Sequence, residues 1–299
     1  MGTTKIPWTD ETWSPVTGCT PVSEGCENCY ARVMACRLRG RCGYPMDKPF
    51  RVTVHHDRLL EPNGWRKPRR CFVSSMGDLF HDNVSRDTIL DVFITMATCP
   101  LSTFQVLTKR PRRMQEILCS KGFAEAVLEL AEELPAKPGE PSDGDGFLKL
   151  SWPLPNVWVG TSCETQQRAD ERISALLQCP AAIHFVSLEP LFSPVDLLPY
   201  VGGWKNGVCF CAPGFGPRLK QVIIGCESRG SSLGRLSVDG TATPAEWWGW
   251  VSKIADQCVE AEVPLFIKQG PSEEGKRLVK MPALDGVVYN QMPETEEDG

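Results

Sequence analysis

Short apolar runs alternate with longer amphipathic stretches along most of the chain. The runs are nearly continuous in Val, Ile, Leu and Phe, which predicts strands buried on both faces of a parallel sheet. They cover residues 71–75, 104–108, 156–162, 183–189, 221–227 and 264–268. Helical periodicity follows in residues 85–98, 123–134, 166–177 and 244–261, with Ser85 at the first N-cap position. This alternation is typical of β/α units around a parallel sheet.

The number of strands leaves two versions of this α/β fold open. A strand at the cysteine loop described below and five apolar runs give six β/α units, and residues 264–268 give a seventh strand. Residues 51–56, with the sequence RVTVHH, could form an eighth strand or an edge hairpin. We therefore expect a single β/α barrel, either partial, with six strands plus a seventh, or full, eight-stranded and TIM-like, with right-handed crossovers.

Two Pro/Gly-rich segments and the C-terminus interrupt the β/α pattern. Residues near 135–155 and 199–219 cannot build a core and are expected to be surface insertions. Residues 285–299 form an acidic end that we expect to be disordered. The sequence thus predicts one barrel domain over residues 1–284, with the cysteine loop at its N-terminal end.

Composition narrows the class of protein further. The 299 residues are 41% hydrophobic, enough for one large core. No apolar run approaches the ~20 residues of a membrane span, and the N-terminus lacks a secretory apolar region. We expect a soluble cytoplasmic protein without a membrane partner. The net charge of -5 excludes a generically basic nucleic-acid coat protein.

The loop WSPVTGCTPVSEGCENCYA carries the strongest chemical signal in the chain. Cys19, Cys26 and Cys29 lie among Gly, Pro and Ser residues, and a helical stretch follows from Tyr30. Thiolates are soft ligands, and three on one short loop can close on a single metal or cluster. A structural zinc site normally uses four protein ligands, so three leave one position free for a small molecule.

This loop, at the head of a β/α chain, resembles that of the radical S-adenosylmethionine (SAM) superfamily. Three thiolates there hold a [4Fe-4S] cluster, and SAM chelates the fourth iron. The opening is also similar to a phage-associated family of unknown function with a WxPxxGCxxxSxGCxNCYA motif. Further similar segments are FVSSMGDLFH, TFQVLTKRPRRM, NVWVGTSCE, FVSLEPL and PLFIKQ. The usual radical SAM spacing places three residues between the first two cysteines, where this chain has six.

The resemblance implies further cofactor contacts. The turn containing Ser75 and Asp78 takes the place of the Gly-Gly-Glu turn that holds the amino group of SAM. Thr161 and Ser162 take the place of the ribose-binding positions. The segment IIGCES adds Gly225, where backbone could approach a ligand, and Glu227, which could bind its hydroxyls or amine.

The residues after each predicted strand form a polar set of their own. Ligands of β/α barrels sit at the carboxyl ends of the strands, so these residues are candidates for a site. The set comprises Ser74, Ser75, Asp78, Thr108, Lys109, Arg110, Thr161, Ser162, Glu164, Ser187, Glu189, Glu227, Ser228, Lys268 and Gln269. Within it, Lys109 and Glu189 are the catalytic candidates.

Two basic clusters and one further cysteine pair complete the candidates. The clusters could form a rim that attracts the phosphates of a nucleic acid. They consist of Arg66, Lys67, Arg69 and Arg70, and of Lys109, Arg110, Arg112 and Arg113. Cys209 and Cys211, in a Gly/Pro loop, could bind a second metal, although most other cysteines lie in apolar settings typical of buried thiols.

Three hypotheses about function follow. The first is a radical SAM-like iron-sulfur enzyme that modifies nucleic acid or a nucleotide, with a possible partner enzyme. The second is an iron-sulfur or zinc protein that binds or processes nucleic acid without radical chemistry. The third is a metal-free binding module whose cysteines are only buried. The polar strand ends favour the first over the third, and the longer cysteine spacing keeps the second open.

Overall fold

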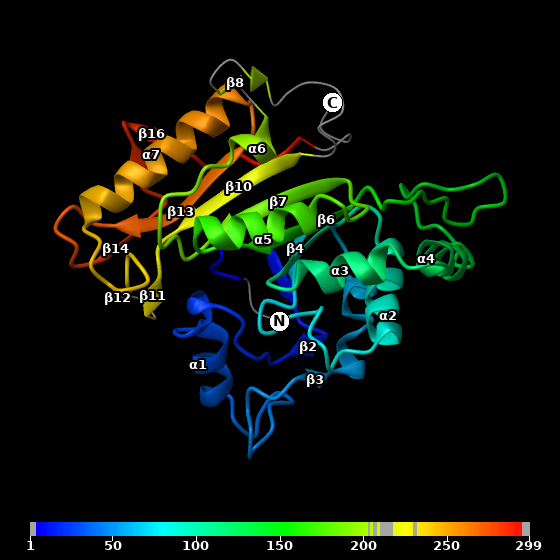
Figure 1. Cartoon of the computed structure of the whole chain (residues 1–299). Coiled ribbons are helices and arrows are strands. Elements are labelled where there is room, and N and C mark those ends of the chain that lie inside the picture. The colour runs from blue at the N-terminus through cyan, green and yellow to red at the C-terminus, as the bar shows by residue number, and fades with distance from the viewer. Residues whose placement is uncertain (1–3, 203, 206–207, 210–217, 230–231, 295–299) are drawn as a thin grey trace. The chain divides into compact units, whose positions relative to one another are not determined.

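The computed structural model describes residues 4–202, 204–205, 208–209, 218–229 and 232–294 (Figure 1). The chain divides into two compact units. Unit 1 comprises Met1–Thr20, Ala31–Gly160 and Cys179–Ala182, and unit 2 comprises Pro21–Tyr30, Thr161–Gln178 and Ile183–Gly299. The single domain predicted from the sequence stays a prediction.

The fold is α/β, with an eight-stranded, mostly parallel sheet. Its strand order is β1-β4-β5-β6-β7-β10-β13-β14. The strands are β1 (Glu11–Trp13), β4 (Arg70–Val73), β5 (Thr103–Thr108), β6 (Val157–Ser162), β7 (Ile183–Leu188), β10 (Leu219–Gly225), β13 (Leu265–Pro271) and β14 (Leu278–Lys280). All six apolar runs therefore form strands, and their order follows the chain.

Closure of this sheet into a barrel is not confirmed. Within the described residues, β1 and β14 stand at its two ends, and β14 runs antiparallel to β13. Residues 51–56 do not supply an eighth barrel strand: only β3 (Thr53–Val54) pairs, antiparallel to β2 (Val16–Thr17), outside the main sheet. The segment leaves this ladder because the chain turns at once into the short helix η2 (His56–Arg58).

Unit 1 has three helices between β4 and β6, two of which, the first and the third, meet at an aromatic centre. They are α2 (Arg86–Ala97), α3 (Pro111–Leu118) and α4 (Phe123–Glu132), drawn beside one another in Figure 1. Phe93 and Phe123 meet edge to face at 5.5 Å, and both contact Trp152. Ser85 caps α2 by accepting a hydrogen bond from the Thr88 amide, as predicted. The helix α1 (Tyr30–Arg37) follows the cysteine loop, and η3 (Glu61–Gly64) precedes β4.

In unit 2, helices α5 (Gln166–Leu176), α6 (Leu198–Val201) and α7 (Pro244–Glu260) accompany the strands. A capping box between Thr243 and Glu246 starts α7, which packs along β13. The cysteine loop contributes η1 (Glu24–Cys26). The short ladders are β8 (Trp204–Lys205) with β9 (Val208–Cys209), β11 (Ser228–Arg229) with β12 (Ser232–Leu233), and β15 (Ala283–Leu284) with β16 (Val287–Val288).

The C-terminal residues take part in this fold up to the last described position. Strand β16 lies within the tail that begins at residue 285, and the amide of Gln291 donates to the Leu265 carbonyl. The described residues end at 294, before the final acidic stretch. No helix in the described part of the chain is long and apolar enough to cross a membrane.

Candidate functional site

The two units divide the cysteine loop between Thr20 and Pro21. Cys19 belongs to unit 1, whereas Cys26 and Cys29 belong to unit 2. All three are outside any disulfide and are partly exposed. No group of three or more His, Cys, Asp or Glu residues in the described ranges is placed to hold a metal ion. The metal prediction for Cys19, Cys26 and Cys29 is therefore untested, and we describe each end of the loop separately.

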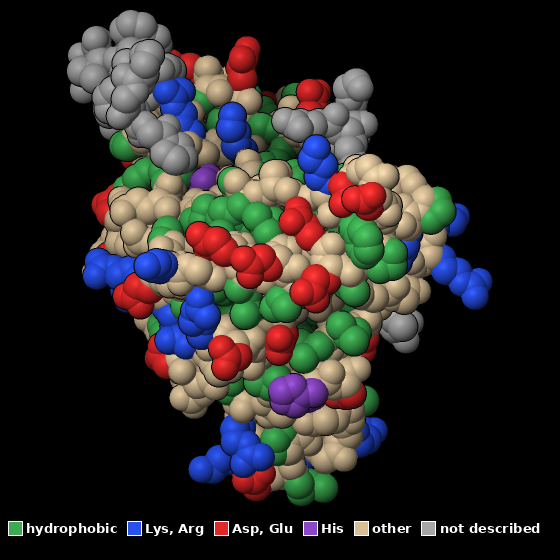
Figure 2. Space-filling view, turned by 90° about the vertical axis from the view of Figure 1, so that its right-hand side faces the viewer, with side chains coloured by type: hydrophobic (Ala, Val, Ile, Leu, Met, Phe, Trp, Pro, Cys, Tyr) green, Lys and Arg blue, Asp and Glu red, His purple; other side chains and the backbone are tan. Residues whose placement is uncertain are grey.

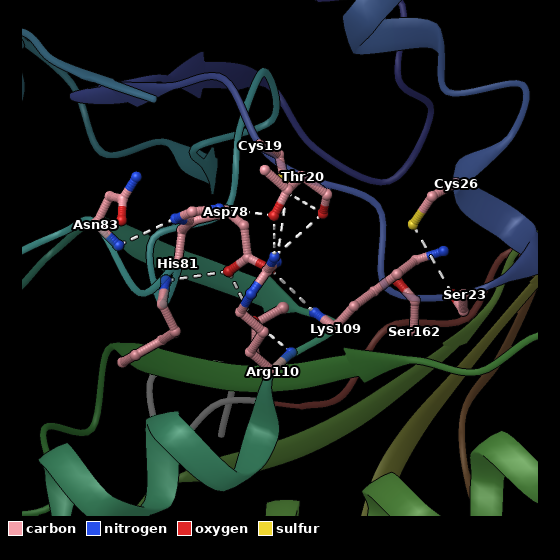
Figure 3. A network of polar contacts seen from close by, with 12 residues as sticks. Cys19, Thr20, Ser23, Cys26, Asp78, His81, Asn83, Lys109, Arg110 and Ser162 are labelled. Carbon is pink, nitrogen blue, oxygen red and sulfur yellow. Dashed lines mark hydrogen bonds and ion pairs between the residues drawn. The ribbon is translucent and has the colours of Figure 1, made fainter. Parts of the chain in front are cut away.

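A guanidinium lies against the sulfur of Cys19. Arg110 follows β5, and its Nη1 is 3.3 Å from Cys19 Sγ, while its Nη2 donates to the carbonyl and the hydroxyl of Thr20 (Figure 3). The Cys19 thiol can also donate to the Thr20 carbonyl at 3.4 Å. A neighbouring cation favours the thiolate, the form of cysteine that binds metals.

Asp78 holds this guanidinium in place. The Arg110–Asp78 ion pair is 2.9 Å long, and the two side chains are only 9% and 6% exposed. Asp78 also accepts from the Thr108 hydroxyl and from the amides of Phe80 and Lys109. Burial lowers the pKa of Arg110, but Asp78 and the Cys19 sulfur raise it, and the balance lies above its ordinary value. The arrangement fixes a positive charge beside Cys19.

His81 fixes the other side of Thr20. Its Nε2 lies 2.9 Å from the Thr20 hydroxyl, and its Nδ1 accepts from the Asn83 amide. An accepting Nδ1 places the proton of the neutral ring on Nε2, which then donates to Thr20. Burial and the nearby Arg110 charge hold the pKa of His81 below its ordinary value. Thr20 is thus held from two directions next to Cys19.

In unit 2, a buried carboxylate organises the start of the loop. Glu164, which follows β6, is fully buried, accepts from the Ser23 hydroxyl at 2.8 Å, and pairs with Arg172 of α5 at 3.1 Å. A Cβ at Gly25 would lie 2.5 Å from Glu164 Cγ and Oε1. Only glycine fits this approach of η1 to the carboxylate, and the Ser23 hydroxyl then lies 3.8 Å from Cys26 Sγ.

A second carboxylate holds the loop near Cys29. The Asn28 side chain donates to both oxygens of Glu227, at 3.1 and 3.0 Å. Arg235 pairs with Glu227 at 3.2 Å, donates to the Glu24 carbonyl, and reaches Glu27. Burial raises the pKa of Glu227, but the hydrogen bonds from Arg235 and Asn28 outweigh it, so the net shift is downward.

The catalytic candidate Glu189 forms a separate pair in unit 2. Its carboxylate lies 2.5 Å from Lys268 Nζ at the end of β13, and Gln269 lies 3.4 Å from the same oxygen. A Cβ at Gly225 would meet Glu189 at 3.1 Å, so the small residue leaves room for this side chain. The structure thus brings Glu189, Gly225 and Lys268 together.

The remaining cofactor candidates lie buried at strand ends. In unit 1, Ser74 and Ser75 are buried, and Ser74 has a positive φ of 54° and no hydrogen-bond partner for its hydroxyl among the described atoms. Such a backbone marks a strained position of the kind found at ligand sites. In unit 2, Thr161 and Ser162 are buried, and the Ser162 carbonyl accepts from Arg172.

The other described cysteines fall into two groups. Three are exposed, namely Cys36, Cys42 and Cys119, and six are buried, namely Cys71, Cys99, Cys163, Cys179, Cys226 and Cys258. Burial raises the pKa of Cys226 and of Cys258 to about 12, and that of Cys99 to about 11. Such thiols stay protonated and do not bind metals readily. The described residues do not include Cys211 or the side chain of Cys209, so the second metal pair stays a prediction.

Several members of the two basic clusters are engaged within unit 1. Arg69 pairs with Glu11 and lies over the Trp65 ring. Arg110 pairs with Asp78, and Arg113 donates to the Val84 carbonyl. On the face drawn in Figure 2, Lys and Arg side chains lie among Asp and Glu side chains. The exposed members are Arg66, Lys67 and Arg112.

Sequence reasoning missed three residues of these networks. Arg172, Arg168 and Arg235 lie far along the chain from the cysteine loop and follow no motif. Arg168 pairs with Glu24 at 3.0 Å. Asn28, by contrast, lies within the cysteine motif itself, directly before Cys29.

Comparisons with known proteins give one match. A family model with the description "Protein of unknown function (DUF5131)" matches residues 3–293, nearly the whole chain. No curated protein and no solved structure matches. These comparisons lend no support to the radical SAM resemblance.

Proposed function

Because this chain belongs to the DUF5131 family, whose function is unknown, we propose a function from its own residues. It is an iron-sulfur protein of the radical SAM-like type, in which Cys19, Cys26 and Cys29 hold one [4Fe-4S] cluster. The observation that carries the proposal is the Arg110 guanidinium, fixed by Asp78, against Cys19 Sγ. A fixed cation favours the thiolate that iron requires.

The donor chemistry of the loop supports this assignment. Three partly exposed thiols occur within eleven residues, whereas six of the other described cysteines are buried. None of the described cysteines forms a disulfide, which supports the proposed cytoplasmic location, where disulfides are rare. The polar networks hold the loop at each end, and all three thiols stay partly exposed. Three thiolates would leave one iron of the cluster open to a further ligand.

The sheet supports the finer, radical SAM-like part of the proposal. Its strand order follows the chain, and the registers of β1–β4, β4–β5, β7–β10 and β10–β13 are parallel. This is the order of a β/α barrel, whose ligands sit at the carboxyl ends of the strands. When bound, SAM on a reduced cluster would supply a 5'-deoxyadenosyl radical for hydrogen abstraction.

The roles of this chain's residues in that chemistry are to bind and to orient. Ser75, Thr161 and Ser162 are the candidates for contacts to SAM. Asp78 and Glu227 accept several hydrogen bonds from protein donors, so we assign them to holding Arg110 and Asn28. Lys109 and Glu189 stay the catalytic candidates, with Lys268 as the ion-pair partner of Glu189.

Iron analysis tests the cluster assignment directly. Protein reconstituted without oxygen should contain about four irons and four sulfides and absorb near ~400 nm, as thiolate-ligated clusters do. The single variants Cys19→Ser, Cys26→Ser and Cys29→Ser should each lose most of this iron. Cys36→Ser is the matched control, because Cys36 is an exposed thiol of α1 outside the motif. Equal iron in control and motif variants would refute the assignment.

A second measurement separates the cluster from its SAM chemistry. Dithionite-reduced protein incubated with SAM should form 5'-deoxyadenosine, detected by mass spectrometry. A bound cluster without this product would favour a non-radical iron-sulfur protein. Zinc in place of iron would favour a zinc protein, and the absence of any metal would leave a binding module.

A further inference from the structure

Basic residues concentrate in the thirty residues after the cysteine loop. Residues 31–60 contain seven Lys and Arg and two Asp, a net charge of +5, while the rest of the chain carries -10. The cations are spread along the segment rather than consecutive. We call residues 31–60, all in unit 1, the basic segment. Its charge is opposite to that of the chain as a whole, which points to an anionic partner.

The basic segment is held by its own hydrogen bonds. The Gly40 amide donates to the Tyr44 carbonyl, and the Tyr44 amide donates to the Arg41 carbonyl, both at 2.9 Å. Gly40 has a φ of +70°, which allows the tight turn after α1. The Tyr44 side chain is buried, and Arg58 donates to the Cys42 carbonyl at 2.6 Å. A fixed loop loses less conformational entropy on binding than a mobile one.

Five cations of the basic segment face solvent. They are Arg37, Arg39, Arg41, Lys48 and Arg51. Arg51 lies 3.7 Å from Asp47, and the described residues show no carboxylate within ion-pair distance of the other four. Figure 1 draws the chain between α1 and β3 at the lower end of unit 1. Figure 2, turned about the vertical axis, shows Lys and Arg side chains at that lower end.

Exposed apolar side chains lie among these cations. Met46 is 68% exposed, Val33 50% and Met34 40%. Phosphate contacts involve the cations alone, so these exposed apolar groups are available for contacts of a different kind. A single nucleic-acid strand offers both complements, because its phosphates attract cations and its unstacked bases present apolar faces.

We propose that the basic segment binds single-stranded nucleic acid, with its cations on the phosphates and its apolar side chains against the bases. The charge and exposure of this surface carry the inference, and it does not depend on the proposed iron-sulfur function. Binding should therefore occur with or without iron. DNA and RNA share the chemistry, and the test includes both.

Salt dependence measures the number of phosphates involved. The full chain is titrated onto a fluorescent 20-nucleotide strand, of DNA or of RNA, at several salt concentrations. Five phosphate contacts predict a slope of log K against log[salt] of about -3.5, since each contributes about -0.7 on single strands. Neutralising three cations in Arg37→Gln/Arg39→Gln/Lys48→Gln should reduce the slope by about 2 and weaken binding at least tenfold at low salt.

Two further variants test whether the salt dependence comes from the basic segment and from its charge. Lys121→Gln/Lys220→Gln/Lys280→Gln removes the same charge from exposed positions elsewhere and should leave the slope unchanged. Arg37→Lys/Arg39→Lys keeps the charge of the segment and should keep most of the slope. A duplex of the same sequence should bind more weakly, because its bases are stacked. No binding at low salt, tighter binding of the duplex, or equal losses in both triple variants would overturn the proposal.

Discussion

The two ends of the cysteine loop are held by opposite charges. At the Cys19 end, in unit 1, a cation lies on the sulfur itself, and a buried carboxylate keeps it there. At the Cys26 and Cys29 end, in unit 2, carboxylates bind the neighbours of the thiols, Ser23 and Asn28. The first arrangement favours one charge state of a sulfur. The second fixes the position of the backbone that carries the sulfurs.

In the proposed metal site, this difference separates a residue that contacts a ligand atom from residues that hold the backbone around the ligands. Residues around ligands orient them and tune their basicity, and their loss often costs as much as a ligand. Here Arg110 would act on ligand chemistry, whereas Glu164 and Glu227 would act on ligand position. Variants of Arg110 should therefore change the chemistry of a bound cluster, whereas variants of Glu164 or Glu227 should change the stability of the loop.

The largest effect is expected from the buried carboxylate of unit 2. Glu164→Ala leaves Arg172, only 7% exposed, without its partner and removes the acceptor of Ser23. Breaking a buried pair by removing one member typically costs about 3 to 5 kcal/mol. Urea denaturation should show a loss of this size, with iron uptake reduced because the loop is released. Glu171→Ala, which removes an exposed carboxylate of α5, is the control and should cost less than about 1 kcal/mol.

A smaller but chemically different effect is expected from Arg110→Met. Asp78 keeps the Thr108 hydroxyl and two backbone amides as donors, so we expect a loss of about 2 to 3 kcal/mol. Hydrogen bonds to cluster sulfurs help to set the reduction potential. A cluster bound by the variant should therefore have a more negative midpoint potential in spectroelectrochemical titration. Arg112→Met, an exposed neighbour, should leave the potential unchanged; an equal shift in both variants would remove Arg110 from this role.

The Gly25→Ala substitution should destabilise the protein through a steric clash alone. The added Cβ would lie 2.5 Å from Glu164, which cannot move aside because Arg172 and Ser23 hold it. Forcing an extra methyl into such a place costs about 1 to 3 kcal/mol. Gly64→Ala is the matched control, since no heavy atom lies within 4 Å of its added Cβ. Thermal unfolding of both variants would show whether the approach of η1 to Glu164 is as close as the structure places it.

The sheet strands were predictable because the signal is local. Consecutive residues of β10, such as Val222, Ile223 and Ile224, are all buried, because both faces of the strand are covered. A continuous apolar run of this length is typical of such a strand. Strands β1 and β14 gave no such signal, because each has only three residues. Residues 51–56 have a stronger apolar pattern, which left an eighth strand or an edge hairpin open, yet only Thr53 and Val54 pair there, with β2.

For the site, the sequence indicated individual residues but not their partners. The cysteine loop as a metal ligand set stays a prediction, and strand-end positions pointed to Asp78, Glu164 and Glu227, which the structure places in the networks at the two ends of the loop. Arg110 is separated from Cys19 by 91 residues, and Arg235 from Glu27 by 208, so only the fold brings these pairs together. The basic segment was missed for another reason. Its cations alternate with other residues, as in Arg37, Arg39 and Arg41, and do not form a run.

The smallest expected effect is on the pH dependence of stability, which should differ between the two ends of the loop. In unit 1, burial holds the pKa of His81 and of His55 below the ordinary 6.5, so each ring is harder to protonate in the folded chain than in the unfolded chain. As the pH falls through about 6.5, the unfolded chain therefore binds more protons than the folded chain, and the free energy of unfolding decreases. In unit 2, the net pKa shifts of Glu24 and Glu227 are downward from 4.5, because hydrogen bonds from Arg168 and Arg235 outweigh burial.

The contribution of these two carboxylates is therefore fully present above about pH 4.5 and is lost as the pH falls through their folded pKa values. Melting temperature measured from pH 8 to pH 3 should decline in two stages. His81→Gln, which can still donate to Thr20, should flatten the stage that begins near pH 6.5 and leave the acidic stage intact. Glu24→Gln should do the reverse, and the exposed His56→Gln should change neither. If His81→Gln altered only the acidic stage, the neutral ring would not be part of the Cys19 end.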